Sequence, residues 1–138
     1  MGWNESEENL MSEKSVAQKL QVREGHKLLI INSPKGYKES LAKDVSKSVV
    51  FLKEAKTPAD IIQVFVTSNR ELGEQLAKLK PLLSPNGILW VTYPTGTSKI
   101  KVDINRDIIR EIAPSFGLEA VAIFSVNENW SALRLKLG

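Results

Sequence analysis

The feature that most constrains the fold of this chain is a series of short apolar segments that alternate with segments of helical periodicity. Residues 61–66 (IIQVFV) form the clearest apolar segment, and a run of this kind is typical of a parallel strand covered on both faces. After it, Ser68 and Glu71 are spaced as in a capping box, and the leucines that follow recur every three or four residues. Strands that alternate with helices predict an α/β domain with a parallel sheet and right-handed crossovers. The expected strands are residues 27–31, 49–52, 61–66, 88–93, 119–126 and 132–136.

The segments between the strands indicate where helices and turns lie. Residues 84–87 (SPNG) have turn composition and are expected to precede the fourth strand as a turn. Residues 127–129 (NEN) leave so short a connection that the last two strands must form an antiparallel hairpin. The expected helices are residues 12–20, 37–46, 68–80 and about 103–116.

Two passages of this chain are similar to passages of Rossmann-like methyltransferases, whose last strand folds back between its two predecessors. They are residues 59–65 (ADIIQVF) and 81–91 (PLLSPNGILWV). More closely, residues 13–138 resemble a small, uncharacterised bacterial family of methyltransferase-like proteins, which brings no established activity with it. The matching stretches are residues 32–37 (NSPKGY), 64–68 (VFVTS) and 127–134 (NENWSALR). The resemblance implies a three-layer, Rossmann-like, methyltransferase-like α/β fold with a mostly parallel six-stranded sheet of order 2-1-3-4-6-5 and an antiparallel C-terminal strand.

Length and composition exclude several classes of protein. A chain of 138 residues is expected to form one domain, here residues 12–138, preceded by a flexible acidic leader at residues 1–11. The chain has no Cys and one His, so a thiolate metal site, a His-based metal cluster and a Ser-His-Asp triad are not expected. His26 is expected at a solvated or core-edge position. Because no apolar run approaches the ~20 residues of a membrane span and no signal peptide is evident, we expect a cytoplasmic protein without a membrane partner.

The net charge of +3 conceals an uneven distribution. Residues 1–13 contain four Glu and no Lys or Arg, so their charge of −4 leaves +7 on residues 14–138. Two interpretations stay open: a basic domain that attracts an anionic partner, or an acidic leader on an ordinary lysine-rich surface. No segment is both strongly basic and interleaved with aromatic residues, so nucleic acid is not an expected partner.

The candidate ligand site lies where the parallel strands end. Ligands of open α/β sheets bind outside the carboxyl ends of the strands, at the point where the strand order reverses, and the first strand occupies that point. The candidate residues on this edge are Ser33, Lys35, Gly36, Tyr37, Thr67, Ser68, Tyr93, Thr97, Ser98, Lys99 and Trp130. Helix N-termini, lysines and an aromatic face would suit a small anionic ligand. In the alternative interpretation the hydroxyl groups only cap helices and the lysines are solvated.

Two features of an S-adenosylmethionine site are missing from the sequence. Such a site needs a glycine-rich loop after the first strand and an acidic residue after the second for the ribose. Gly36 is alone in its loop, Pro34 removes a backbone N–H, and the best acidic candidate is Glu54. No catalytic residue and no metal ligand is predicted. The leading hypothesis is therefore a non-enzymatic or uncharacterised Rossmann-like domain that binds a small anionic ligand or a protein partner. The alternative is a divergent S-adenosylmethionine-dependent methyltransferase.

Overall fold

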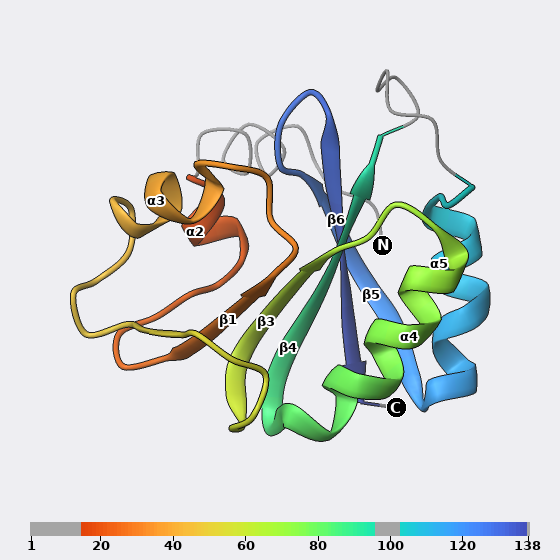
Figure 1. Ribbon diagram of the computed structural model, residues 1–138, viewed down its shortest axis with the longest axis horizontal. Helices are drawn as coiled ribbons and strands as arrows, with labels where there is room; N and C mark the ends of the chain where they lie inside the picture. Colours follow the sequence, from red (N-terminus) through yellow and green to blue (C-terminus); the bar gives the residue numbers. More distant parts are fainter. Residues whose placement is uncertain (1–14, 96–102, 138) are drawn as a thin grey trace.

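A single six-stranded sheet forms the centre of the molecule (Figure 1). The computed structural model describes residues 15–95 and 103–137. The strands are β1 (Lys27–Ile31), β2 (Val50–Leu52), β3 (Ala59–Phe65), β4 (Leu83–Pro94), β5 (Leu118–Ser125) and β6 (Trp130–Leu137). Their order is β2-β1-β3-β4-β6-β5, which confirms the predicted order. β1 pairs in parallel with β2 and β3, β3 with β4, and β6 alone runs antiparallel to its neighbours β4 and β5.

Helices cover both faces of the sheet, so the domain has the expected three layers (Figure 1). α4 (Asn69–Leu79) and α5 (Arg106–Ile112) lie on one face, and α2 (Val16–Lys19) and α3 (Tyr37–Ala42) lie on the other. α4 and α5 each continue into a 3₁₀ turn, η1 (Lys80–Leu82) and η2 (Ala113–Phe116). Each turn contains a proline near its start, and proline cannot donate the hydrogen bond that would extend the α-helix.

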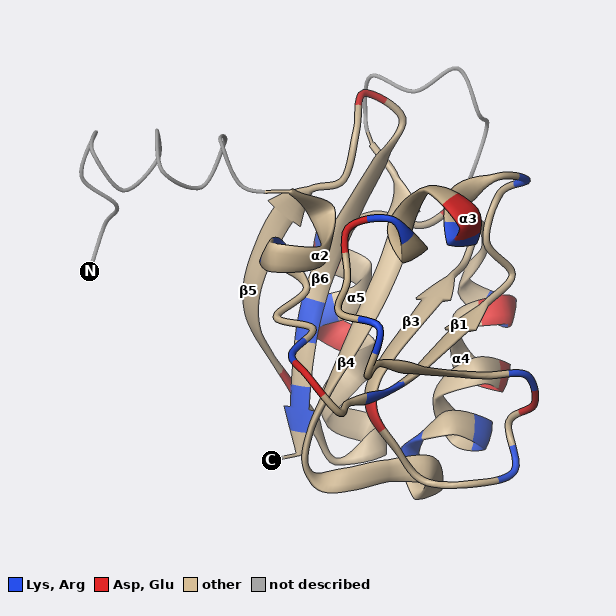
Figure 2. Cartoon of the chain, turned by 90° about the vertical axis from the view of Figure 1, so that its left-hand side faces the viewer, with Lys and Arg blue, Asp and Glu red and all other residues tan. Residues whose placement is uncertain are grey.

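The sheet separates two apolar cores. One core lies beneath α4 and α5 and includes the buried leucines of α4 together with Ile62, Val64 and Val91. The other includes Ile61, Phe65 and Trp90 on the α2 and α3 side. The two sets alternate along β3 because successive side chains of a strand point to opposite faces. Apart from Lys27 and Asp60 near their starts, the central strands β1, β3 and β4 carry no charged residues (Figure 2).

The short helix α2 is tied to the centre of the sheet. Ser15 caps it and forms a capping box with Gln18. The first residues of the helix expected at residues 12–20 lie outside the described residues. The indole Nε1 of Trp90 donates to the carbonyl oxygen of Leu20 at 3.0 Å, and both side chains are almost completely buried. The segment before β1 is therefore an integral part of the domain.

The turn expected at residues 84–87 proved to be part of β4. Leu83 pairs with Ala59, and regular pairing resumes at Ile88 with Ile61, so the polar residues between them form an irregularity inside the strand. Gly87 makes this geometry possible because a Cβ there would lie 2.9 Å from the carbonyl oxygen of Ser84. None of the helices in the described ranges is long and apolar enough to cross a membrane.

Candidate functional site

The loop that follows β1 contains two residues in the left-handed region of backbone conformation. Asn32 has φ 59° and Gly36 has φ 84°. Asparagine adopts this region more readily than most residues, and glycine does so without strain. A Cβ built on Gly36 would meet nothing within 4 Å, so the space beside its backbone is open. Asn32 thus gives the loop a left-handed conformation of the kind that a second glycine would allow. The sequence signal for this conformation is an Asn directly after a strand.

A chain of hydrogen bonds connects this loop to β3 and β4. The hydroxyl of Tyr37 donates to Oε1 of Gln63 at 2.7 Å, and Nε2 of Gln63 donates to Oγ1 of Thr92 at 3.0 Å. Gln63 and Thr92 are completely buried, so their polar atoms need these partners. Burial raises the pKa of Tyr37 to about 12, against a smaller lowering by the contact with Gln63. Gln63 was missed as a site residue, although a Gln inside an apolar strand is visible in the sequence.

Three aromatic rings join the loop after β1 to the hairpin between β5 and β6. Tyr37 packs edge-on against Phe65 with ring centroids 4.9 Å apart, and Trp130 packs edge-on against Phe65 at 5.1 Å. Edge-to-face contacts of this kind are the favoured geometry for aromatic pairs. The structure therefore brings Tyr37 and Trp130, two of the candidate residues, together on one side of the sheet.

The hairpin turn is also bound to the end of β4. The backbone N–H of Thr95 donates to the carbonyl oxygen of Asn129 at 3.0 Å, and its hydroxyl donates to the carbonyl oxygen of Glu128 at 3.1 Å. Within the turn, Oδ1 of Asn127 accepts from the backbone N–H groups of Asn129 and Trp130. These bonds hold Trp130 at the carboxyl edge, where the hairpin prediction placed it.

Other candidate residues have structural roles or lie elsewhere. Oγ of Ser68 accepts from the N–H of Glu71 and caps α4, while the N–H of Thr67 donates to the Glu71 carboxylate. Tyr93 is buried in the core beneath α4 and α5, on the opposite side of the sheet from Tyr37, and burial raises its pKa despite nearby arginines on α5. Ser33 is half-buried and Lys35 is exposed in the β1 loop. Thr97, Ser98 and Lys99 lie outside the described residues.

The acidic candidate after β2 lies at the surface. Glu54 follows the end of β2 by two residues and forms an exposed ion pair with Lys56 at 3.2 Å. In the described part of the chain, no group of three or more His, Asp or Glu could hold a metal ion.

Solved structures of known proteins share this arrangement of strands and helices. An S-adenosylmethionine-dependent methyltransferase from Aquifex aeolicus matches with a TM-score of 0.62 and 15% identity, over 99% of this chain and 100% of that one. A TehB-like S-adenosylmethionine-dependent methyltransferase from Corynebacterium glutamicum matches with a TM-score of 0.60 and 12% identity, over 95% of this chain and 94% of that one. An S-adenosylmethionine-dependent methyltransferase from Thiobacillus denitrificans, solved with S-adenosyl-L-homocysteine, matches with a TM-score of 0.59 and 10% identity, over 95% of this chain and 91% of that one. The fold is methyltransferase-like.

Comparison of the sequence with known families and curated proteins identifies no relative. No protein-family model matches the chain, and no curated protein matches it in sequence.

The structural matches correct the leading interpretation of the sequence. That interpretation was a domain of unestablished activity that binds a small anionic ligand or a protein partner at this edge. The three solved structures named above are S-adenosylmethionine-dependent methyltransferases, so they favour the alternative. The interpretation failed because it gave the missing glycines too much weight, whereas Asn32 adopts the left-handed conformation without being glycine.

Proposed function

We propose that this protein is a divergent S-adenosylmethionine-dependent methyltransferase whose cofactor binds at the carboxyl edge of β1 and β2. The observation that carries the proposal is the sheet order with its reversed last strand, which such enzymes share over nearly the full length of both chains. In a sheet of this order the ligand crevice lies beside the first strand, where the order reverses.

The loop after β1 fits the cofactor in its backbone geometry. The left-handed turns at Asn32 and Gly36 and the open space beside Gly36 allow a ligand to approach the backbone closely. The Lys35 ammonium would pair with the carboxylate of the cofactor, and the exposed Glu54 carboxylate would accept from the ribose hydroxyls. When bound, the cofactor supplies an electrophilic methyl group on a sulfonium.

Three aromatic side chains of the protein lie beside this edge of the sheet. Tyr37, Phe65 and Trp130 form a connected apolar surface that would exclude water from an acceptor group. Because its pKa is raised to about 12, Tyr37 keeps its proton at neutral pH and donates to Gln63. Tyr37 therefore serves as a positioning group in this proposal and not as a base.

A narrower assignment is part of the same proposal. Residues 32–37, 64–68 and 127–134 are the stretches in which the chain resembles the small bacterial family of methyltransferase-like proteins. The aromatic and hydrogen-bonded residues Tyr37, Phe65, Asn127 and Trp130 fall within them, which supports a common site in that family.

Calorimetric titration with S-adenosylmethionine and S-adenosyl-L-homocysteine tests the proposal. We expect saturable binding, and we expect Glu54→Gln to weaken it about tenfold or more because a charged acceptor of hydrogen bonds is lost. Glu74→Gln is the matched control. Glu74 also forms an exposed ion pair, with Arg70 at 3.0 Å, but on α4, away from the β1 and β2 ends.

The proposal fails if neither compound binds in the millimolar range or raises the melting temperature of the folded protein. If Glu54→Gln and Glu74→Gln weaken cofactor binding equally, Glu54 is not part of the site, but the proposal that the cofactor binds still holds. Release of S-adenosyl-L-homocysteine in the presence of candidate acceptors then measures methyl transfer itself.

A further inference from the structure

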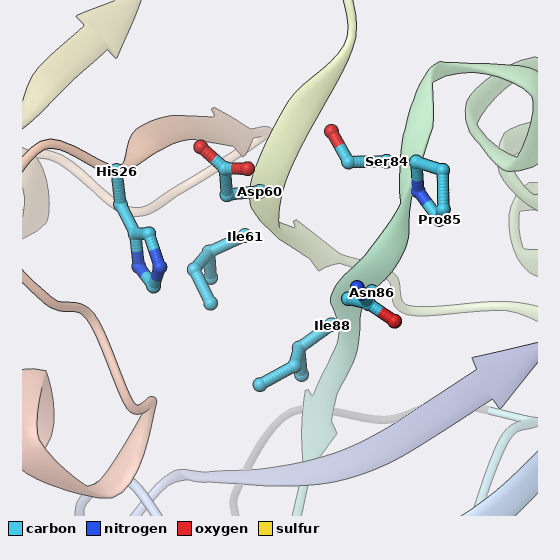
Figure 3. Close-up of a pocket in the computed structure, with 7 residues that line it drawn as sticks. All are labelled: His26, Asp60, Ile61, Ser84, Pro85, Asn86 and Ile88. Atoms are coloured by element: carbon cyan, nitrogen blue, oxygen red, sulfur yellow. The ribbon is translucent and has the colours of Figure 1, made fainter.

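A pocket lies at the amino edge of the sheet, opposite the candidate site, where β1, β3 and β4 begin. Its volume is about 340 Å³, within the range of roughly 300–1,000 Å³ that is usual for small-molecule sites. The residues that line it come from the start of each strand: His26, Asp60, Ile61, Ser84, Pro85, Asn86 and Ile88 (Figure 3). The irregular first part of β4 forms one wall, so the pocket exists because residues 84–87 do not pair regularly with β3.

One carboxylate provides all the formal charge of the pocket lining. The lining contains Asp60 and no Lys or Arg. Oδ2 of Asp60 accepts from the backbone N–H of Lys27 at 2.8 Å, which holds the carboxylate in place and leaves Oδ1 to accept from a ligand. In Figure 3 this carboxylate lies between His26 and the Ser84 hydroxyl. A fixed carboxylate in a concave site attracts a cation or a strong hydrogen-bond donor.

His26 is held in one tautomer by the turn before β1. Its Nδ1 accepts from the backbone N–H of Arg23 at 3.0 Å. In a tautomer that accepts this bond, Nδ1 carries no proton and Nε2 carries the N–H that can donate. His26 thus offers a hydrogen-bond donor to the site.

Ile61, Pro85 and Ile88 supply the apolar part of the pocket lining. Ile61 and Ile88 are almost completely buried and project on the same side of the pocket as the His26 ring (Figure 3). Apolar floors with a few convergent polar groups are typical of sites for small organic ligands.

We propose that this amino-edge pocket, formed by His26, Asp60, Ser84, Ile61 and Ile88, binds a small organic ammonium ion. The ammonium group lies against the Asp60 carboxylate, and the hydrocarbon body packs on the apolar lining at Pro85 and Ile88. A ligand oxygen, where present, accepts from Nε2–H of His26. The site is separate from the carboxyl edge, so the result of its test does not depend on the cofactor proposal.

Titration of the isotope-labelled full chain with three probes of one shape, followed by amide NMR, tests this inference. The probes are benzylamine, its neutral counterpart benzyl alcohol and the anion benzoate, at constant ionic strength and into the millimolar range. We expect saturable shifts with benzylamine, centred on the amides of Asp60, Ile61 and Ile88, and at least about tenfold weaker binding of the other two probes.

A charge-removing substitution supplies the second test. Asp60→Asn keeps an oxygen acceptor for the Lys27 N–H but removes the negative charge, so benzylamine binding should weaken about tenfold or more. Asp44→Asn, at an exposed position between α3 and β2, is the control and should bind as the parent does. Equal binding of benzylamine and benzyl alcohol, preference for benzoate, or shifts spread over the surface would each overturn the proposal. The probe comparison needs no variant, so it decides the matter even if Asp60→Asn does not fold.

Discussion

Two glycines in opposite surroundings allow the packing of this fold to be tested with one chemical change. Gly73 lies in the interior of α4, and a Cβ added there would meet nothing within 4 Å. Gly87 lies in the irregular part of β4, and a Cβ there would lie 2.7 Å from Cδ1 of Leu83, 2.9 Å from the oxygen of Ser84 and 3.1 Å from that of Asp60. The substitution Gly→Ala should therefore have opposite effects at the two positions.

The magnitudes follow from the two environments. Gly73→Ala should raise the free energy of unfolding by about 0.5–1 kcal/mol, because alanine favours the helix and restricts the unfolded chain. Gly87→Ala should lower it by about 1–3 kcal/mol. The Leu83 side chain can move aside, but the Ser84 and Asp60 oxygens belong to the backbone of β4 and β3 and cannot move without disturbing their pairing.

Urea unfolding of the two variants and the parent measures both changes on one scale. The midpoints should move in opposite directions while the dependence on urea concentration stays the same, since neither substitution alters the surface exposed on unfolding. A neutral or stabilising Gly87→Ala would show that residues 84–87 do not have the close backbone approach described above. The pocket at the amino edge would then lose the wall that defines it.

Two further predictions concern buried polar groups. Trp90→Phe removes the donor to the Leu20 carbonyl and should cost about 1–3 kcal/mol in urea unfolding from the unpaired group alone, so a loss within error of zero would contradict the contact. The chain's two tyrosines, Tyr37 and Tyr93, should both ionise above 10 while the protein is folded, with Tyr37 at about 12, as followed by phenolate absorbance. Because the folded-state pKa of Tyr37 exceeds its unfolded value of 10.0, its contribution to stability is intact below pH 10 and is lost as the pH rises toward about 12. A phenolate signal near pH 10 in a folded sample would refute this.

The sheet was predictable from the sequence because its determinants are local and repeated. Apolar runs such as residues 61–66 indicate covered parallel strands, and a short turn at residues 127–129 forces a hairpin. The capping residue Ser68 and the leucine spacing after it predicted α4 within about a residue of its bounds. The start of β4 was missed because residues 84–87 have turn composition, and only the backbone of β3 beside them shows that they remain in the sheet.

The candidate site was less predictable because its contacts join distant parts of the chain. Nothing local indicates that Tyr37 donates to Gln63, 26 residues later, or that Trp130 packs on Phe65. Positive φ at Asn32 is likewise a property of the folded loop, since asparagine adopts other conformations more often. Glycine content alone was therefore a poor guide to whether this loop could receive a ligand.

The anchoring of α2 bears on the order in which the chain acquires its structure during synthesis. Leu20 emerges from the ribosome 70 residues before its hydrogen-bond partner, the Trp90 indole. Until β4 has been made and has paired with β3, this four-residue helix lacks the Trp90 side chain that anchors it, and so short a helix is not stable alone. Nascent chains arrested before residue 90 should therefore leave residues 15–22 open to proteases, and protection of that segment should begin only once the fourth strand has been released.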